Sequence, residues 1–127
     1  MKKQRFICYI ITIMFLVSAC SSEDNDKVKI YEMLSFTETK VDSMKEITDL
    51  ADVNILLTAF KSASENMGIA DMEVPHYKVD FGNRAYFLWI NEDSGIIMDV
   101  ENTHITYSLS KSSVQNINKI INSHYEK

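Results

Sequence analysis

One acidic turn holds oxygen-bearing side chains at a spacing that a calcium ion could use. The segment Asn91-Glu92-Asp93-Ser94-Gly95, followed by Asp99, offers amide and carboxylate oxygens. An EF-hand-type loop needs oxygens at positions 1, 3 and 5, a glycine at position 6 and a bidentate glutamate at position 12. Here glycine comes fifth and Asn102 stands twelfth. The sequence therefore favours an acidic hairpin turn with Gly95 at a positive φ, and calcium binding stays an alternative.

Three histidines are further candidates for metal ligands or general bases: His76, His104 and His124. None has a second histidine or a cysteine at metal-ligand spacing. His104 follows Thr103 and the acidic turn at Glu101-Asn102, where a hydrogen-bonding role in the turn is favoured over a catalytic one. We expect neither a metal site nor a cofactor.

The sequence also lacks the motifs of an activated nucleophile or a phosphate-binding loop. It contains no Gly-x-Ser-x-Gly motif, and its three glycines stand far apart. Neighbouring carboxylates such as Glu92/Asp93 and Asp99/Glu101 occur, but acidic residues are common throughout this chain. We therefore expect a protein that is not an enzyme.

Aromatic side chains alternate along one apolar segment, with Phe87 and Trp89 on one face and Tyr86 on the other. They could form a platform for a glycan or a peptide. Aromatic residues that alternate in a central strand more often belong to a core. The exposure of Trp89 decides between these two interpretations.

The N-terminus carries an export signal. Three positive charges lie within the first five residues, and the apolar stretch over residues 6–17 is 12 residues long. A transmembrane helix needs about 20 residues, so this stretch fits a cleavable signal peptide instead. Residues 16–20, Leu-Val-Ser-Ala-Cys, resemble the lipobox of bacterial lipoproteins. The resemblance implies that residues 1–19 are removed and that the Cys20 thiol carries a diacylglycerol.

Removing residues 1–19 takes three of the 13 Lys and Arg and none of the 18 Asp and Glu, which leaves a formal charge of −8. Such an acidic surface argues against a nucleic-acid partner. Cys8 leaves with the signal and Cys20 is used by the lipid, so no disulfide is expected. Residues 20–26 predict a polar tether that reaches at most about 25 Å. Residues 27–127 then form a single domain.

The first half of the domain predicts two strands and a helix. A strand is expected over residues 27–36 and a short one over residues 44–47. Asp49 caps a helix that runs to about Ser64. Residues 65–75 form a loop. The buried positions should be Val28, Ile30, Leu34 and Phe36 in the strand, and Leu50, Val53, Leu57 and Phe60 in the helix.

The second half predicts a meander and a closing helix. Strands are expected over residues 76–81, 84–90, 96–100 and through Ile105, Tyr107 and Leu109. Gly82-Asn83 supplies two positive-φ residues for a tight hairpin, and residues 101–103 form another turn. Ser110 caps a helix that buries Val114, Ile117 and Ile121. The order is ββ-α-ββββ-α, an α+β domain in which an antiparallel meander packs with two helices.

Several short motifs lie along this second half: Tyr86-Phe87-Leu88-Trp89-Ile90, Ser94-Gly95, Met98-Asp99, Thr103-His104 and Tyr107-Ser108-Leu109-Ser110. Two more precede them, residues 68–72 and 75–79. Together they resemble the YhfM-like lipoprotein family of Bacillus-type bacteria, over roughly residues 27–123. The resemblance implies a lipid-anchored protein on the plasma membrane of a Gram-positive cell. It implies no activity, cofactor or catalytic residue.

These observations lead us to expect a non-enzymatic, lipid-anchored interaction module on the extracytoplasmic face of the cell membrane. Its partner would be a membrane or secreted protein. The expected interaction edge joins two turns of the meander, through Asn91, Asp93, Thr103 and His104. The alternative is an accessory protein of a transporter or sensor that binds a small ligand or an ion in a pocket lined by Trp89, Tyr107 and acidic side chains.

Overall fold

The computed structural model describes residues 26–68 and 71–126. Within these ranges the chain is an α+β fold with one antiparallel sheet, in the order β2-β1-β4-β5-β6-β7-β3. The strands are β1 (Val28–Glu32), β2 (Lys45–Ile47), β3 (Ser64–Glu65), β4 (Tyr77–Asp80), β5 (Ala85–Ile90), β6 (Gly95–Asp99) and β7 (Asn102–Ser108). The helices are α2 (Leu50–Lys61) and α3 (Lys111–Tyr125). The expected fold class is confirmed. Helix α2 ends at Lys61, before the expected end near Ser64, and the two-residue strand β3 begins at Ser64, just before the segment expected as a loop.

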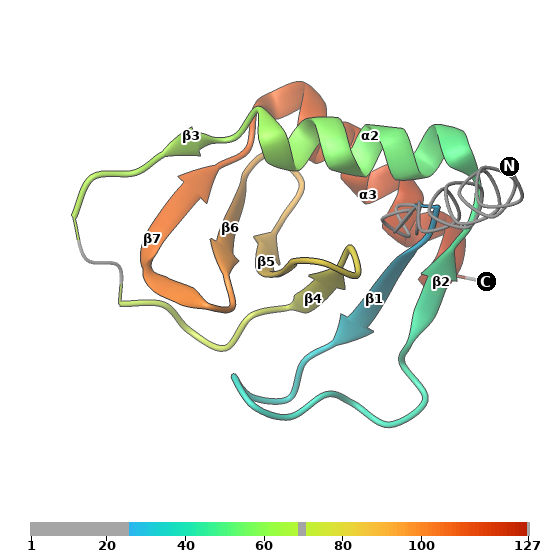
Figure 1. The fold of residues 1–127 in the computed structure, drawn as a ribbon, viewed down its shortest axis with the longest axis horizontal. Helices are drawn as coiled ribbons and strands as arrows, with labels where there is room; N and C mark the ends of the chain where they lie inside the picture. The colour runs from blue at the N-terminus through green and yellow to red at the C-terminus, as the bar shows by residue number, and fades with distance from the viewer. Residues whose placement is uncertain (1–25, 69–70, 127) are drawn as a thin grey trace, which may run out of the picture.

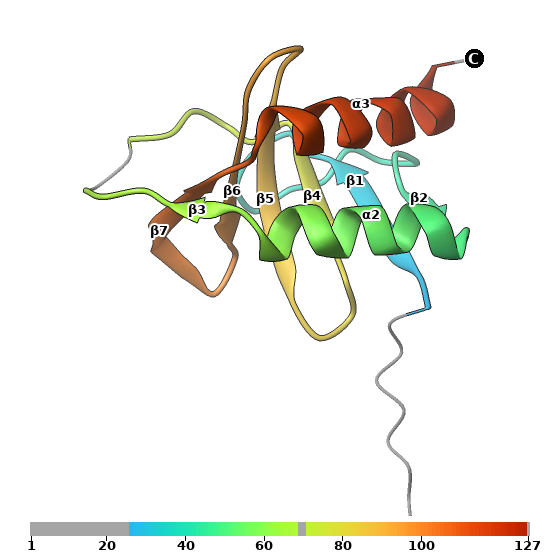
Figure 2. The same cartoon turned by 90° about the horizontal axis from the view of Figure 1, so that it is seen from above.

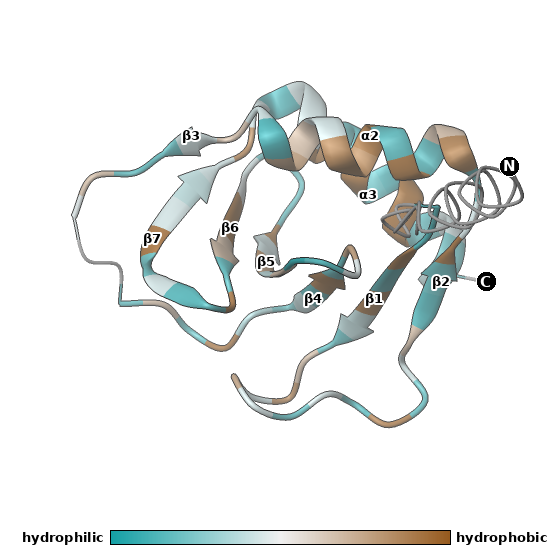
Figure 3. Ribbon diagram, viewed as in Figure 1, coloured by the Kyte–Doolittle hydropathy of each residue, from teal (hydrophilic) through white to brown (hydrophobic). Residues whose placement is uncertain are grey.

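The molecule has three layers. Both helices lie along one face of the sheet, and the β1–β2 loop and residues 71–76 lie against the other (Figures 1 and 2). Alternate strand residues such as Ile30, Val79, Leu88 and Ile97 are buried beneath the helices. The helices are striped apolar and polar around their axes, as amphipathic elements are (Figure 3).

Helix α2 begins as expected but buries a different stripe. The Asp49 side chain accepts hydrogen bonds from the backbone N–H groups of Ala51 and Asp52. Leu50 is 63% exposed, so the expectation that it is buried is wrong. The buried stripe lies a quarter turn further round, and Leu57 is half-buried at its edge. The buried residues are Val53, Leu56, Ala59 and Phe60.

Strand β1 is shorter than expected. The chain turns after Met33, where Leu34 and Ser35 both donate their backbone N–H groups to the Glu38 carbonyl. Leu34 and Phe36 therefore leave the core, with exposed fractions of 58% and 41%. The expected strand to residue 36 is wrong because these local hydrogen bonds replace the strand pairing.

Two turn residues also differ from expectation. Gly82 has a φ of +94°, but Asn83 does not have a positive φ. Gly95 does not have one either. A β-carbon on Gly95 would lie 2.8 Å from Leu109 Cδ1 and 3.2 Å from Val114 Cγ2. Glycine is thus needed at residue 95 for close packing under α3, and the expected conformational reason is wrong.

A second, smaller core lies on the face of the sheet that no helix covers. It consists of Phe87, Trp89 and Met98, with Met33, Met72, Ile96 and Val100 packed against it. The Trp89 indole N–H donates to the Glu73 carbonyl at 2.8 Å. Trp89 is 9% exposed, so the loops bury it and an open aromatic platform is excluded at this residue.

Helix α3 matches its prediction. The Ser110 hydroxyl accepts from the Ser113 backbone N–H, and the expected apolar positions Val114, Ile117 and Ile121 are buried. In the part of the chain that the structure describes, neither helix is long and apolar enough to cross a membrane. The expected signal peptide, Cys20 and the expected tether up to residue 25 lie outside the described residues.

Candidate binding groove along helix α3

Two open hollows meet along the polar side of α3. The first, of about 670 Å³, is lined by Asn91, Glu92, Gln115, Asn118, Lys119, Asn122 and Glu126. The second, of about 570 Å³, is lined by Glu32, Met33, Lys40, Val74, Pro75, His76, Tyr77, Ile90, Asn118, Ile121 and Asn122. Because they share Asn118 and Asn122, we treat them as one surface and name it the α3 groove.

Side-chain amides form the helical wall of the α3 groove. Gln115, Asn118 and Asn122 are three and four residues apart, so they project from the same side of α3. The Asn118 side-chain N–H group donates to the Asn91 carbonyl at 2.8 Å. This bond fixes the Asn118 amide and joins the β5–β6 turn to the helix. Each amide can both donate and accept hydrogen bonds.

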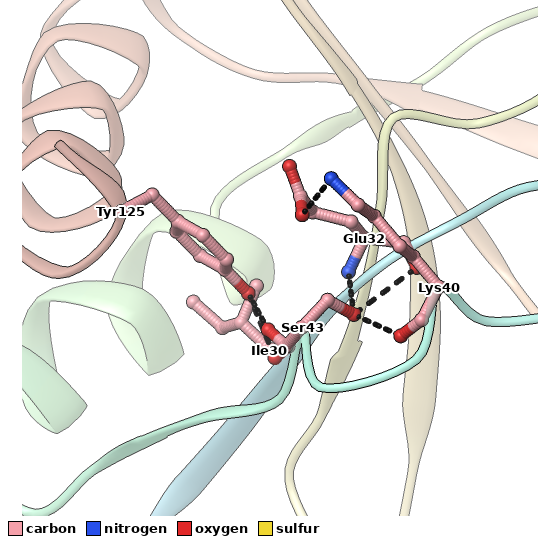
Figure 4. Close-up of polar contacts among 5 residues, drawn as sticks. All are labelled: Ile30, Glu32, Lys40, Ser43 and Tyr125. Atoms are coloured by element: carbon pink, nitrogen blue, oxygen red, sulfur yellow. Dashed lines mark hydrogen bonds and ion pairs between the residues drawn. The ribbon is translucent and has the colours of Figure 1, made fainter.

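The opposite wall belongs to the β1–β2 loop, which a buried serine holds in place (Figure 4). The Ser43 hydroxyl donates to the Lys40 carbonyl at 2.7 Å and accepts from the Glu32 backbone N–H at 3.0 Å. The Lys40 ammonium lies 3.3 Å from the Glu32 carboxylate. Ser43 is 3% exposed, so water competes little for its two hydrogen bonds. Ser43 therefore positions both charged groups of this wall.

Tyr125 connects the end of α3 to the same wall. Its hydroxyl lies 2.9 Å from the Ile30 carbonyl and 2.8 Å from the Ser43 carbonyl, which share its single proton (Figure 4). Burial raises the pKa of Tyr125, and the nearby Glu32 carboxylate and Tyr77 raise it further. The phenol therefore stays protonated and keeps its donor.

The floor of the groove lies where β4 and β5 meet. The imidazole Nδ1 of His76 accepts from the Ile90 backbone N–H at 3.0 Å, so His76 has a structural role. The Tyr77 ring lies 5.6 Å from the Tyr125 ring. Burial raises the pKa of Tyr77, and the carboxylates of Glu32 and Glu126 add to the shift. The groove thus combines neutral amides and phenols with the charged side chains of its walls, around a partly apolar floor.

The oxygen groups of the alternative calcium site do not come together. The Asn91 side-chain oxygen accepts from the backbone N–H groups of Asp93 and Ser94 and from the Ser94 hydroxyl. Asp99 lies at the opposite end of β6, 3.5 Å from the Arg84 guanidinium. Across residues 26–68 and 71–126, no cluster of three or more His, Cys, Asp or Glu side chains could hold a metal ion.

The expected interaction edge is likewise divided by the strands. Asn91 and Asp93 precede β6, whereas Thr103 and His104 follow it at its other end, inside β7. Asn91 lines the α3 groove, and Thr103 and His104 are exposed beside the β6–β7 turn, at the other end of β6. These four residues therefore do not form one surface. His124 lies half-buried in the last turn of α3.

The alternative pocket is not formed either. Trp89 belongs to the small core under the loops, while Tyr107 packs against the helix-side core. The amides of α3 are not among the site residues expected from the sequence. Their signal was present in the spacing of Gln115, Asn118 and Asn122 on the polar side of an amphipathic helix.

A family model described as the YhfM protein matches residues 23–127, which include every residue that lines the α3 groove. The chain belongs to the YhfM family. The match confirms the resemblance that the motifs between residues 68 and 110 indicate. No curated protein and no solved structure matches this YhfM-family chain.

Proposed function

We propose that this YhfM-family chain is a lipid-anchored, non-enzymatic binding module on the extracytoplasmic face of the membrane, with the α3 groove as its binding surface. The observation that carries the proposal is the position of the groove relative to the start of β1. The chain enters β1 at Val28, and Glu32 at the other end of β1 lines the groove. Five strand residues separate these two ends by about 13 Å.

The topology supports one orientation of the domain. Cys20 is eight positions before Val28, so a lipid on Cys20 would hold the start of β1 within about 28 Å of the bilayer. We call this end of the sheet the tether end, and it includes the β4–β5 hairpin. The β5–β6 turn and α3 lie at the opposite end, which is the groove end (Figure 2). A groove that faces away from the bilayer is accessible to membrane and secreted proteins.

The lipid anchor is tested by Cys20→Ala in the native host. We expect the purified variant to carry no acyl chains, because Cys20 supplies the only proposed attachment point. Cys8→Ala, inside the apolar stretch of the signal, is the matched control, and its mature form should carry two acyl chains as the wild type does. Intact-mass measurement of the purified proteins makes this comparison. A mature wild-type mass without acyl chains would overturn the anchor.

A further inference from the structure

We propose that the α3 groove binds an extended polypeptide segment that lies alongside α3, with its backbone held by the side-chain amides of Asn118 and Asn122. This inference rests on the proposed function and names the ligand class of that site. A primary amide carries one acceptor and two donors, so it can pair with the C=O and the N–H of a peptide backbone at the same time.

The spacing of the two asparagines suits an extended chain. Four residues of α-helix advance about 6 Å along the axis. Two residues of an extended strand advance about 6.6 Å, and groups that far apart point in the same direction. Asn118 and Asn122 can therefore reach equivalent backbone groups of residues i and i+2 of a bound segment. Gln115, about 4.5 Å before Asn118 along the axis, extends the row.

The amide of Asn118 is oriented before any ligand arrives. Its N–H group donates to the Asn91 carbonyl, which leaves its side-chain oxygen as an acceptor in a fixed direction. Asn122 is exposed one turn further along the groove. A site with a fixed group loses less conformational freedom on binding than a site that must be ordered by its ligand.

The second hollow supplies surface for side chains. Its apolar lining consists of Pro75 and Ile121, which are buried, and of Met33, Val74 and Ile90, which keep accessible surface. Val74 is 43% exposed and gives this surface an accessible edge. Successive side chains of an extended segment point to opposite sides. Every second side chain of the ligand can thus cover apolar surface while its backbone pairs with the asparagines.

A glycan fits these observations less well than a polypeptide. Sugar rings pack on exposed aromatic faces, and the aromatic residue of the groove, Tyr77, is half-buried against Tyr125. Trp89 is buried on the other face of the sheet. The charged groups of the first hollow, Glu92, Glu126 and Lys119, are acidic in sum, so a segment with Lys or Arg is favoured.

The experiment is in-cell photo-crosslinking of the full, lipidated chain. A photoreactive amino acid replaces Lys119, at the rim of the groove, or Asn116, on the same helix but outside the groove. We expect polypeptide adducts from residue 119 and few from residue 116. Mass spectrometry identifies the crosslinked segment, and the synthetic peptide of that segment is then titrated against the purified full chain.

The titration uses Asn122→Ala and the matched control Asn116→Ala. Loss of a hydrogen-bonding amide should weaken peptide binding about tenfold in the first variant, and the second should bind like the wild type. Equal adducts at the two positions, or unchanged peptide affinity of Asn122→Ala, would overturn the proposal. Glycan adducts at residue 119 would overturn the polypeptide while keeping the groove as a binding surface. Failure of the lipid anchor is measured separately, as a mature wild-type mass without acyl chains.

Discussion

Tyr125 shows how one side chain near the C-terminus can stabilise elements far away in the sequence. Its hydroxyl serves the carbonyls of Ile30 in β1 and Ser43 in the following loop. Both contacts hold the wall that faces the asparagines of α3. Removing the hydroxyl leaves these partly buried carbonyls without that donor, which typically costs about 1 kcal/mol.

The free energy of unfolding should therefore decrease at alkaline pH, where Tyr125 can lose its phenolic proton. The pKa of Tyr125 is raised in the folded state, so the unfolded chain loses the phenolic proton first as the pH rises above about 10. The contribution of Tyr125 to the free energy of unfolding is complete below this pH. Above it, the contribution falls by at most about 1.4 kcal/mol per pH unit. The real slope is smaller because the ring is partly solvated.

Tyr125→Phe provides the measurement. Urea unfolding at pH 8 should find the wild type about 1 kcal/mol more stable than the variant. At pH 11 the difference in free energy of unfolding between the two proteins should disappear, because only the wild type has the Tyr125 phenol, which can ionise. Tyr77, whose pKa is also raised, is present in both proteins and cancels in the comparison. A gap that stays constant with pH would contradict the role of Tyr125.

Gly95 gives a second prediction for a single residue. Gly95→Ala places a methyl group against Leu109 and Val114, which are both buried in the helix-side core. We expect the variant to lose about 1–3 kcal/mol of stability, as overpacked cores do. Asp93→Ala, in the exposed part of the same turn, should change stability by less than about 0.5 kcal/mol. Equal melting temperatures of the two variants would contradict this prediction, because they would show that Leu109 and Val114 can move to make room for the methyl group.

Gly95 and Trp89 also mark the limit of prediction from sequence for single residues. A glycine after Asn-Glu-Asp-Ser indicates a turn equally well whether it is needed for its φ or for space. The difference depends on Leu109 and Val114, which follow it by 14 and 19 positions. Likewise, the alternation at Trp89 locates the strand, whereas its burial depends on loops elsewhere in the chain.

At the scale of elements, the β1–β2 loop depends on Ser43. Ser43→Ala removes an acceptor for the Glu32 N–H and a donor to the Lys40 carbonyl. We expect faster amide hydrogen exchange over residues 33–44, because the loop then opens at a lower free-energy cost. Ser35→Ala, in the exposed turn of the same loop, is the control and should change exchange only near Thr37. Unchanged protection of Glu32 in Ser43→Ala would contradict this role.

The elements differ in how far the sequence determines them. Both helices and the meander were predicted because their apolar periods are long enough to identify, and Asp49 and Ser110 cap the helices as expected. Strand β3 was missed because two residues carry no period. Its pairing with β7 depends on Asn66, which bonds to Thr106 and Ser108 some 40 positions away. The α3 groove could not be predicted for the same reason, because segments far apart in the sequence build it.

At the scale of the whole molecule, the orientation on the membrane can be measured. Asn83, in the β4–β5 hairpin, lies at the tether end, and Glu92 lies at the groove end. A fluorophore on Asn83→Cys should be quenched by headgroup-labelled lipids more strongly than one on Glu92→Cys, in vesicles that carry the lipidated protein. Cys20 would already be acylated, so each variant has one reactive thiol. Equal quenching at the two positions would contradict a fixed orientation.

The two edge strands of the sheet affect how closely copies of the protein can pack without aggregating. Strands β2 and β3 are three and two residues long, and each carries a charged residue, Glu46 or Glu65. Strand β7, which pairs with β3, also pairs with β6, and the register of this second pairing shifts between Met98 and Asp99 of β6. Copies held by the proposed lipid anchor would meet at high density in two dimensions, where long flat margins would template fibrils. Short, charged and irregular margins should keep neighbouring copies from joining their sheets, so a membrane that carries the proposed anchor could be densely covered without aggregation.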